Sequence, residues 1–202
     1  MNRIMTTSLV SIALMAPSAF AFGQDMGSEP DVRPYLGAGV GLSRANDFCD
    51  SADGSPVDCD KEDVAYKGIA GVRIGPMFGL EGGYTDLGEA TQSLAGAKGN
   101  VNVDGYLAQA GLYLPANEHV SLFAKGGMFF WDMNANLVAA NSSISHRDAS
   151  GSDPVGSLGI EGALSDNLRV QLQYDRYFNV GKEDDTGESD IDVIGLNAIV
   201  LF

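Results

Sequence analysis

The sequence predicts an all-β protein, an eight-stranded antiparallel up-and-down transmembrane β-barrel, and three observations carry that prediction. Apolar residues alternate with small or polar residues in eight segments of roughly ten residues, which is the period of a β-strand. Glycine accounts for 26 of the 202 residues, and many of these glycines lie inside the alternating segments. Short and long connections alternate strictly between the segments, as they do in transmembrane barrels.

The first segment, residues 35–42, places four apolar side chains on one face and Tyr35 followed by three glycines on the other. Closely spaced glycines also occur in dinucleotide-binding loops, but Leu42 stands where that motif needs its last glycine. No helical pattern follows. The segment is therefore predicted to be a strand.

The second and third segments, residues 64–74 and 78–85, are joined by a Gly-Pro turn. The polar face of the second segment carries Lys67 and Arg73, and that of the third carries Glu81 between glycines. Both segments are predicted strands with one apolar face.

The fourth and fifth segments, residues 103–114 and 120–130, are joined by a Pro-Ala-Asn-Glu turn. Gln109 and Lys125 lie on their polar faces. The short connection predicts an antiparallel pair.

The last three segments are residues 155–164, 168–177 and 191–202. A Ser-Asp-Asn turn joins the first two, whose polar faces hold Glu161 and Gln171. The final segment completes the eight predicted strands.

The second face of these strands is too polar to form the core of a soluble sandwich, so the apolar face is expected to point outward into lipid. Closure into a barrel then satisfies every backbone group without an exposed edge. Aromatic residues near the long-connection ends are expected to form a girdle at the membrane interface: Tyr66, Tyr84, Tyr106, Phe130 and Tyr174. The long connections are expected to be polar loops at residues 45–63, 88–100, 134–153 and 178–190.

Residues 1–21 have the features of a secretory signal peptide: a basic start, an apolar run and an Ala-Phe-Ala cleavage site. The predicted organisation is therefore a signal peptide, a short N-terminal segment at 22–32 and a barrel at 33–202. The net charge of −15 argues against a nucleic-acid partner, and no sequence feature indicates a cofactor.

Cys49 and Cys59 are the only cysteines, and an even number in an exported chain predicts a disulfide. Two thiols without a nearby histidine fall short of a zinc site. The acidic loops at 45–63 and 178–190 do not fit the twelve-residue calcium loop, so we expect a solvated surface rim and assign no metal site.

His146 lies in the third long connection near serine and aspartate residues, among them Ser142, Ser143, Asp148 and Ser152. These residue types are common in loops, and no spacing defines a nucleophile with its base. The sequence therefore does not predict an enzyme.

Residues 78–88, which read FGLEGGYTDLG, resemble the third strand of the barrel domain of outer membrane protein A and its relatives. Residues 113–115 resemble the second turn of that family, and residues 125–128 resemble its fifth strand. The resemblance covers most of residues 33–202. It implies that the terminal Phe202 is a signal read by the barrel-assembly machinery. Since the sequence ends at Phe202, the peptidoglycan-anchoring role of the longer family members is not expected.

The resemblance also implies a lumen filled by charged side chains, which an eight-stranded barrel is just wide enough to hold. Isolated buried charges are costly, so the inward acidic residues are expected to pair with Lys125 or Arg73. Gln109 and Gln171 stand where the family pattern has basic residues, which favours a fixed hydrogen-bonded plug centred on Lys125. The predicted plug consists of Arg73, Glu81, Gln109, Lys125, Glu161 and Gln171.

The sequence thus predicts a monomeric protein of a Gram-negative outer membrane, in contact with its lipids, with a structural or cell-surface role. It does not identify an extracellular partner. Two alternatives stay open: a small low-conductance channel, and a soluble periplasmic lipid-binding barrel.

Overall fold

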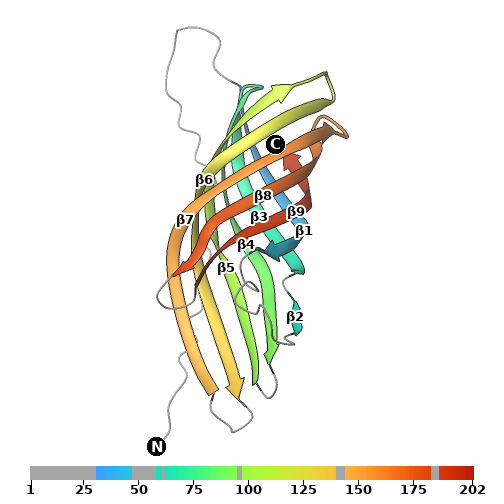
Figure 1. The fold of residues 1–202 in the computed structure, drawn as a ribbon. Helices are drawn as coiled ribbons and strands as arrows, with labels where there is room; N and C mark the ends of the chain where they lie inside the picture. The colour runs from blue at the N-terminus through green and yellow to red at the C-terminus, as the bar shows by residue number, and fades with distance from the viewer. Residues whose placement is uncertain (1–30, 47–57, 61, 95–96, 140–143, 183–186) are drawn as a thin grey trace, which may run out of the picture.

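Eight long strands form a closed antiparallel ring, and a short additional strand attaches to one of them (Figure 1). The computed structural model describes residues 31–46, 58–60, 62–94, 97–139, 144–182 and 187–202. Strand β1 pairs with β9, and β4 pairs with β5, so each of the eight long strands has a neighbour on both sides and the ring is closed. The predicted eight-stranded up-and-down barrel is confirmed. The strands are β1 (Val32–Ala45), β2 (Asp58–Asp60), β3 (Glu62–Ile74), β4 (Phe78–Leu94), β5 (Ala97–Pro115), β6 (Val120–Ala139), β7 (Ile144–Ala163), β8 (Leu168–Lys182) and β9 (Gly187–Leu201).

Large apolar side chains cover the outside of the ring, as the alternation predicted. On β1, Leu36 and Leu42 are 57% and 67% exposed, whereas Tyr35, which faces the lumen, is 2% exposed. Exposing so much apolar surface around the whole circumference would be unfavourable in water. The wall is therefore suited to lipid, and we refer to these outward residues as the apolar band.

The aromatic residues predicted to form a girdle lie on the outside, towards the end of the barrel where the long connections are. Tyr84 and Tyr106 contact each other edge to face, with ring centroids 5.4 Å apart. On seven strands the next outward residue beyond the apolar band is charged: Arg44, Glu62, Asp86, Asp104, Asp132, Arg176 and Asp192. This change of chemistry marks the edge of the apolar band at what we call the loop end of the barrel. The opposite end, with the short turns, is the turn end.

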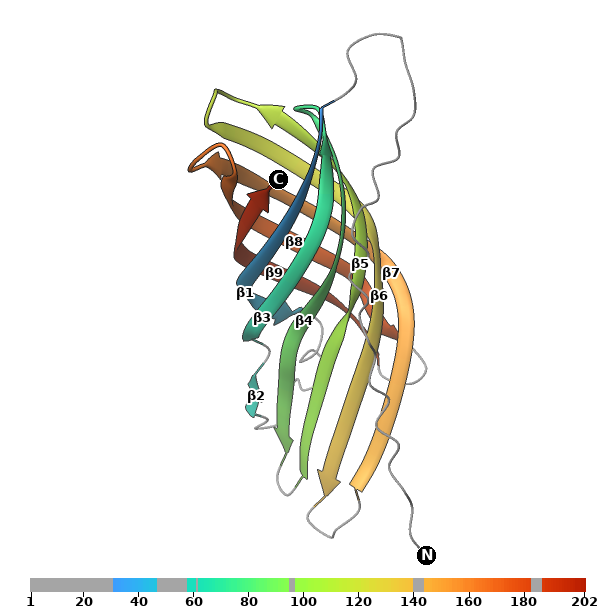
Figure 2. The same ribbon diagram turned by 180° about the vertical axis from the view of Figure 1, so that it is seen from behind.

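Three of the four predicted long loops are wrong, because most of their residues continue the strands. In the predicted loop 178–190, β8 continues to Lys182 and β9 begins at Gly187. Strands β4 and β5 extend to Leu94 and Ala97, and β6 and β7 extend to Ala139 and Ile144. Figures 1 and 2 show these four strands running past the ends of the others. Where β6 and β7 begin to extend, the inward residues Trp131 and Met133 are buried, and Ala149 packs against the same cluster. The strands are consequently 13 to 20 residues long rather than about ten.

The remaining predicted loop contains a short strand. Strand β2 lies within the predicted loop 45–63 and pairs with residues 91–93 of β4. Its partner segment exists only because β4 continues beyond the apolar band. The sequence pattern of three residues carried no usable strand signal.

Glycines facing the lumen make room for large aromatic side chains on the adjacent strand. Tyr35 lies directly across from Gly71, and a Cβ atom at Gly71 would come within 2.5 Å of the tyrosine ring. Trp131 has the same relationship to Gly151, again at 2.5 Å. Close approach of rings to the backbone therefore explains part of the high glycine content.

The predicted signal peptide at 1–21 lies outside the described residues, and β1 begins at Val32, one residue before the predicted barrel boundary. Among the residues that the structure describes, no helix has the length and apolar character needed to cross a membrane.

Candidate functional site: the barrel lumen

Strand β8 supplies the central row of polar side chains in the lumen. Its inward residues, from the turn end towards the loop end, are Arg169, Gln171, Gln173, Asp175 and Tyr177. They occupy every second position, so the row follows directly from the period of the strand. Three ion pairs are arranged along this row.

The middle ion pair joins Lys125 of β6 to Glu81 of β4, with Nζ and Oε2 2.8 Å apart. Both side chains are almost completely buried, with 1% and 2% exposure. Tyr35 donates its hydroxyl hydrogen to the same Oε2 at 2.8 Å. Lys125 also donates to Oε1 of Gln173 at 3.2 Å and of Gln171 at 3.4 Å. The buried ammonium group therefore has three acceptors.

The second ion pair lies nearer the turn end, between Arg73 of β3 and Glu161 of β7. Arg73 Nη2 donates to Glu161 Oε2, which also accepts from Gln171 Nε2 at 2.7 Å. Arg169 Nη1 lies 3.9 Å from the other carboxylate oxygen. The Arg73 guanidinium stacks over the Tyr113 ring at 3.3 Å, a cation–π contact.

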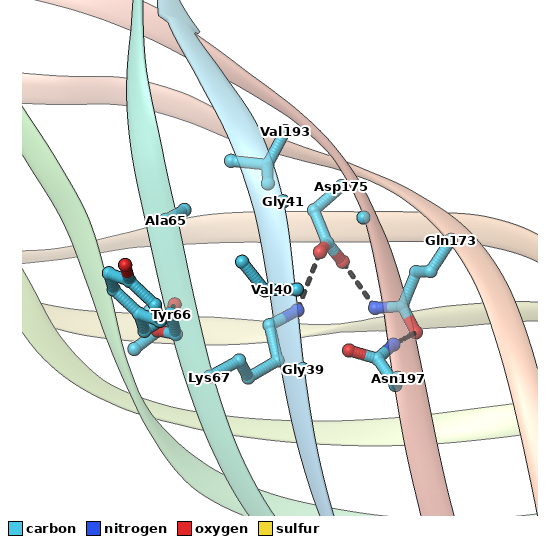
Figure 3. A pocket seen from close by; sticks show the side chains of 12 residues that line it. Gly39, Val40, Gly41, Ala65, Tyr66, Lys67, Gln173, Asp175, Val193 and Asn197 are labelled. Carbon is cyan, nitrogen blue, oxygen red and sulfur yellow. Dashed lines mark hydrogen bonds and ion pairs between the residues drawn. The ribbon is translucent and has the colours of Figure 1, made fainter.

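The third ion pair lies nearer the loop end, where Lys67 Nζ is 2.5 Å from Asp175 Oδ2 (Figure 3). The other oxygen of Asp175 accepts from Ser157 and from Gln173, each at 2.5 Å. Asn197 donates to Gln173 Oε1 at 3.1 Å. A cavity of about 10 Å³, enough for roughly one water molecule, lies beside this ion pair.

Gln171 and Gln173 connect the three ion pairs into one network, which we call the luminal network. Gln171 contacts both Glu161 and Lys125, and Gln173 contacts both Lys125 and Asp175. The amide groups can do this because each carries donors and an acceptor. A charged side chain at either position would lack that dual capacity.

The structure places all six residues of the predicted plug in the lumen, and it adds residues that the sequence prediction missed. Gln109 takes part by donating to Ser157 at 3.0 Å. The Lys67–Asp175 pair was missed, although strand alternation marks both residues as inward.

The loop-side part of the lumen is apolar, which contradicts the expectation of a polar interior throughout. Phe129 and Tyr177 are completely buried and meet edge to face, with centroids 4.8 Å apart. None of the buried members of this cluster is more than 7% exposed. Seven barrel strands supply buried members, and β1 supplies the partly buried Ala45. We call this cluster the apolar cap; its buried members are Ala65, Leu87, Val103, Leu107, Phe129, Trp131, Met133, Val155, Tyr177, Val180, Ile191 and Val193.

A separate ion pair lies on the outside at the loop end, beyond the apolar band. Arg176 Nη2 and Asp190 Oδ2 are 2.6 Å apart, and Asp192 lies 3.7 Å from the same guanidinium. Asp190 also accepts from the backbone N–H of Asn179 at 3.0 Å. The hydrogen bond from Arg176, followed by that from Asn179, holds the pKa of Asp190 below its ordinary value.

Several sequence predictions fall on parts of the chain that the structure does not describe. Cys49, Ser142 and Ser143 are outside the described residues, as are the side chains of Cys59 and His146. The disulfide therefore stays a prediction. In the described part of the chain, no group of three or more His, Cys, Asp or Glu side chains is arranged to hold a metal ion.

A closed antiparallel ring with an apolar outer wall and charged groups inside defines a transmembrane β-barrel. The family of the OmpA-like transmembrane domain matches residues 30–202. The chain belongs to this family.

Two curated relatives are the outer membrane proteins A of Shigella flexneri and Salmonella typhi. They are 25% and 24% identical to the chain over 155 residues, which is 76% of this chain. The matched region is 43% of the length of each relative. The chain thus corresponds to less than half of those proteins.

Two solved structures have a similar fold. Neisserial surface protein A aligns over 84% of this chain and 97% of its own, with a TM-score of 0.58 and 13% identity. Ail of Yersinia pestis, solved with the heparin analogue sucrose octasulfate, aligns over 85% of this chain and 99% of its own, with a TM-score of 0.56 and 16% identity. At these identities the likeness concerns the fold alone.

Proposed function

We propose that this protein is a closed barrel of a Gram-negative outer membrane, with a structural or cell-surface role and no open pore. The turn end faces the periplasm and the loop end faces the exterior, as the short and long connections of outer-membrane barrels do. The proposed role is not catalytic. The terminal Phe202 is the proposed contact with the barrel-assembly machinery during insertion.

The observation that carries this proposal is that two different layers of side chains fill the lumen. The luminal network fills the part nearer the turn end with paired charges, and the apolar cap fills the part nearer the loop end. An ion would have to separate buried ion pairs in the first layer and lose its hydration in the second. Each layer alone is a barrier, and they act in series.

A cell-surface role is supported by the extension of β4, β5, β6 and β7 beyond the apolar band. These strands offer a surface of paired, hydrogen-bonded backbone. Their outward residues next to the band include Asp86, Asp104 and Asp132, which are directly opposite one another on adjacent strands. This acidic face is poorly matched to a polyanion such as the heparin analogue bound by Ail.

Ion conductance in a planar bilayer tests the closed lumen. The wild type is expected to show no steady conductance, and Lys125→Ala alone is expected to stay closed because the apolar cap is intact. The double variant Lys125→Ala with Phe129→Ala opens both layers and is expected to conduct. The matched control, Lys125→Ala with Phe130→Ala, changes a lipid-facing ring instead and is expected to stay closed.

Steady conductance of the wild type would overturn the closed barrel and favour the low-conductance channel. Membrane fractionation of the tagged protein tests the location separately. Recovery in the outer-membrane fraction is expected, and recovery in the soluble fraction would favour the periplasmic lipid-binding barrel.

A further inference from the structure

Three arginines from three strands converge on the lumen at its turn end. Arg33 of β1 and Arg73 of β3 are directly opposite each other in the β1–β3 ladder. Arg169 of β8 faces the same end of the lumen, where it approaches Glu161. Like charges at directly opposed positions of a sheet destabilise it unless something compensates them.

Within this group of arginines and their ion-paired carboxylate, the charges do not balance. Arg73 and Arg169 share one carboxylate, that of Glu161. Arg33 donates to the backbone oxygen of Asp166 at 3.2 Å, and in the described part of the chain it has no ion pair. The group therefore carries three guanidinium ions against one carboxylate. The rest of the luminal network is balanced, since Lys125 and Lys67 each have their own carboxylate.

Hydrogen-bond donors of this group are also in excess. The Nε atoms of Arg73 and Arg169 are both buried, and neither has an acceptor. A guanidinium has five donors in a planar fork that matches two oxygens of a carboxylate or phosphate. Unpaired buried donors are unfavourable, and negative charge beside the exposed part of these side chains would offset the excess positive charge.

The arginines are accessible to a ligand, whereas the charges deeper in the lumen are not. The side chain of Arg169 is 26% exposed and that of Arg73 is 11% exposed, and Arg33 is half-buried. Lys125 and Glu81, in contrast, are nearly sealed. A ligand therefore reaches this group from the turn end and stops below the Lys125–Glu81 pair.

We propose that Arg33, Arg73 and Arg169 form an oxyanion-binding vestibule at the turn end of the barrel. The ligand chemistry is a phosphate or carboxylate group that adds a second set of acceptors beside Glu161. Phosphate has two sources at this end, the headgroup of a neighbouring phospholipid and the free ion in solution. The vestibule does not require the lumen to be closed, so this proposal and the closed barrel succeed or fail independently.

The test is a titration of the purified protein with inorganic phosphate in maltoside micelles, which contain no phosphate. Line broadening of the ³¹P resonance measures binding, and chloride keeps the ionic strength constant. Wild type is expected to show saturable binding. Arg33→Gln with Arg169→Gln is expected to bind at least about tenfold more weakly, the loss of about 1.4 kcal/mol of binding free energy.

The control is Arg44→Gln with Arg176→Gln, which removes two arginines at the loop end and is expected to bind as the wild type does. Circular dichroism checks that each variant is folded, and if the vestibule double variant fails to fold, Arg33→Gln alone is used, since Arg33 makes no ion pair in the described residues. Absence of saturable broadening in the wild type, or equal affinity in the vestibule variant, would overturn the proposal.

Repeating the titration in phospholipid nanodiscs separates the two sources. If a lipid headgroup occupies the vestibule, added phosphate no longer binds in the nanodiscs. If the free ion is the ligand, phosphate binds equally in micelles and nanodiscs. Either result supports the vestibule, provided that the arginine dependence holds in micelles.

Discussion

Lys125 and Glu81 form an ion pair across a strand that lies between them. Lys125 is on β6 and Glu81 is on β4, and β5 separates the two strands in the ring. Gln109 of β5 lies directly opposite both Glu81 and Gly127. The two side chains meet on the concave, inner side of the sheet, so the pair requires that the sheet curves between β4 and β6. It ties together strands that make no ladder with each other.

Removing the ammonium group from this pair should be strongly destabilising. Lys125→Ala leaves Glu81 buried without its cation, a change that costs about 3–5 kcal/mol in the free energy of unfolding. Urea unfolding followed by tryptophan fluorescence in lipid vesicles measures it. The control is Glu118→Ala in an exposed turn, with an expected change within about 0.5 kcal/mol. Equal stability of the two variants would contradict the role given to Lys125.

Adding one methyl group at Gly71 should destabilise the barrel, because that position faces the ring of Tyr35. The new Cβ would lie 2.4 Å from the backbone oxygen of Leu80 and 2.5 Å from the Tyr35 ring. Gly71→Ala is therefore expected to cost about 1–3 kcal/mol. Gly68→Ala is the matched control on the same strand, since a Cβ at Gly68 meets no atom within 4 Å. The two variants are compared by thermal unfolding, and a neutral Gly71→Ala would disprove the close packing.

Truncating a ring inside the barrel should cost more than truncating its neighbour outside. Phe129 is completely buried in the apolar cap, whereas Phe130 on the next position is 50% exposed on the outer wall. Phe129→Ala leaves a cavity and is expected to cost about 3–5 kcal/mol. Phe130→Ala leaves a space that lipid chains fill, so its cost should be clearly smaller. The reverse order in urea unfolding would contradict the assignment of the two faces.

Acid should loosen the loop end of β8 and β9 through Asp190. Its pKa is lowered in the folded protein from an ordinary value of 3.8, chiefly by the hydrogen bond from Arg176. The stabilisation from a lowered carboxylate pKa is complete above the ordinary value and is lost as the pH falls through the folded value. Hydrogen exchange of the Asn179 amide, corrected for its intrinsic pH dependence, is expected to accelerate below the ordinary value.

The variant Arg176→Gln is the comparison for this titration. Without the guanidinium, the pKa of Asp190 returns towards 3.8, so the acceleration should begin at a higher pH. Identical midpoints in wild type and variant would show that Arg176 does not control the titration.

The C-terminal residue is expected to matter for assembly more than for the stability of the finished barrel. Phe202 is 64% exposed, and its backbone N–H donates to the Pro34 oxygen at 2.9 Å. Deleting Phe202 should lower the amount of protein in the outer-membrane fraction several-fold, while Phe202→Tyr should not. Immunoblotting of fractionated membranes measures both, and normal insertion of the truncated chain would count against the assembly signal.

The sequence predicts the wall of this barrel well, because each residue's face follows from strand period alone. Leu36 lies outside and Tyr35 inside with no need of tertiary information. The inward position of Glu81, Lys125 and Glu161 was predictable for the same reason. Short turns such as that before β6 set the antiparallel neighbours.

The partners across the lumen were not predictable, because they depend on the register between strands and on curvature. Whether Glu161 pairs with Lys125 or Arg73 is decided by the stagger of β3 and β7, which are not neighbours in the ladder. The extension of β6 and β7 was hidden for another reason. Their outward residues beyond the band, such as Asp132 and Asn134, are polar like those of loops, and only the buried inward Trp131 and Met133 mark them as paired strands.

The pairing of β1 with β9 determines when the barrel becomes complete. This ladder joins the first strand of the ring to the last, from Tyr35 opposite Leu201 to Ala45 opposite Ile191. Before it forms, β1 and β9 both present open edges, and the chain is a curved sheet able to pair with other chains. Contacts so distant in sequence form late because closing the intervening chain is entropically costly. The apolar cap includes Ile191 and Val193 of β9 and the luminal network includes Asn197, so the interior of this protein is complete only when the seam closes.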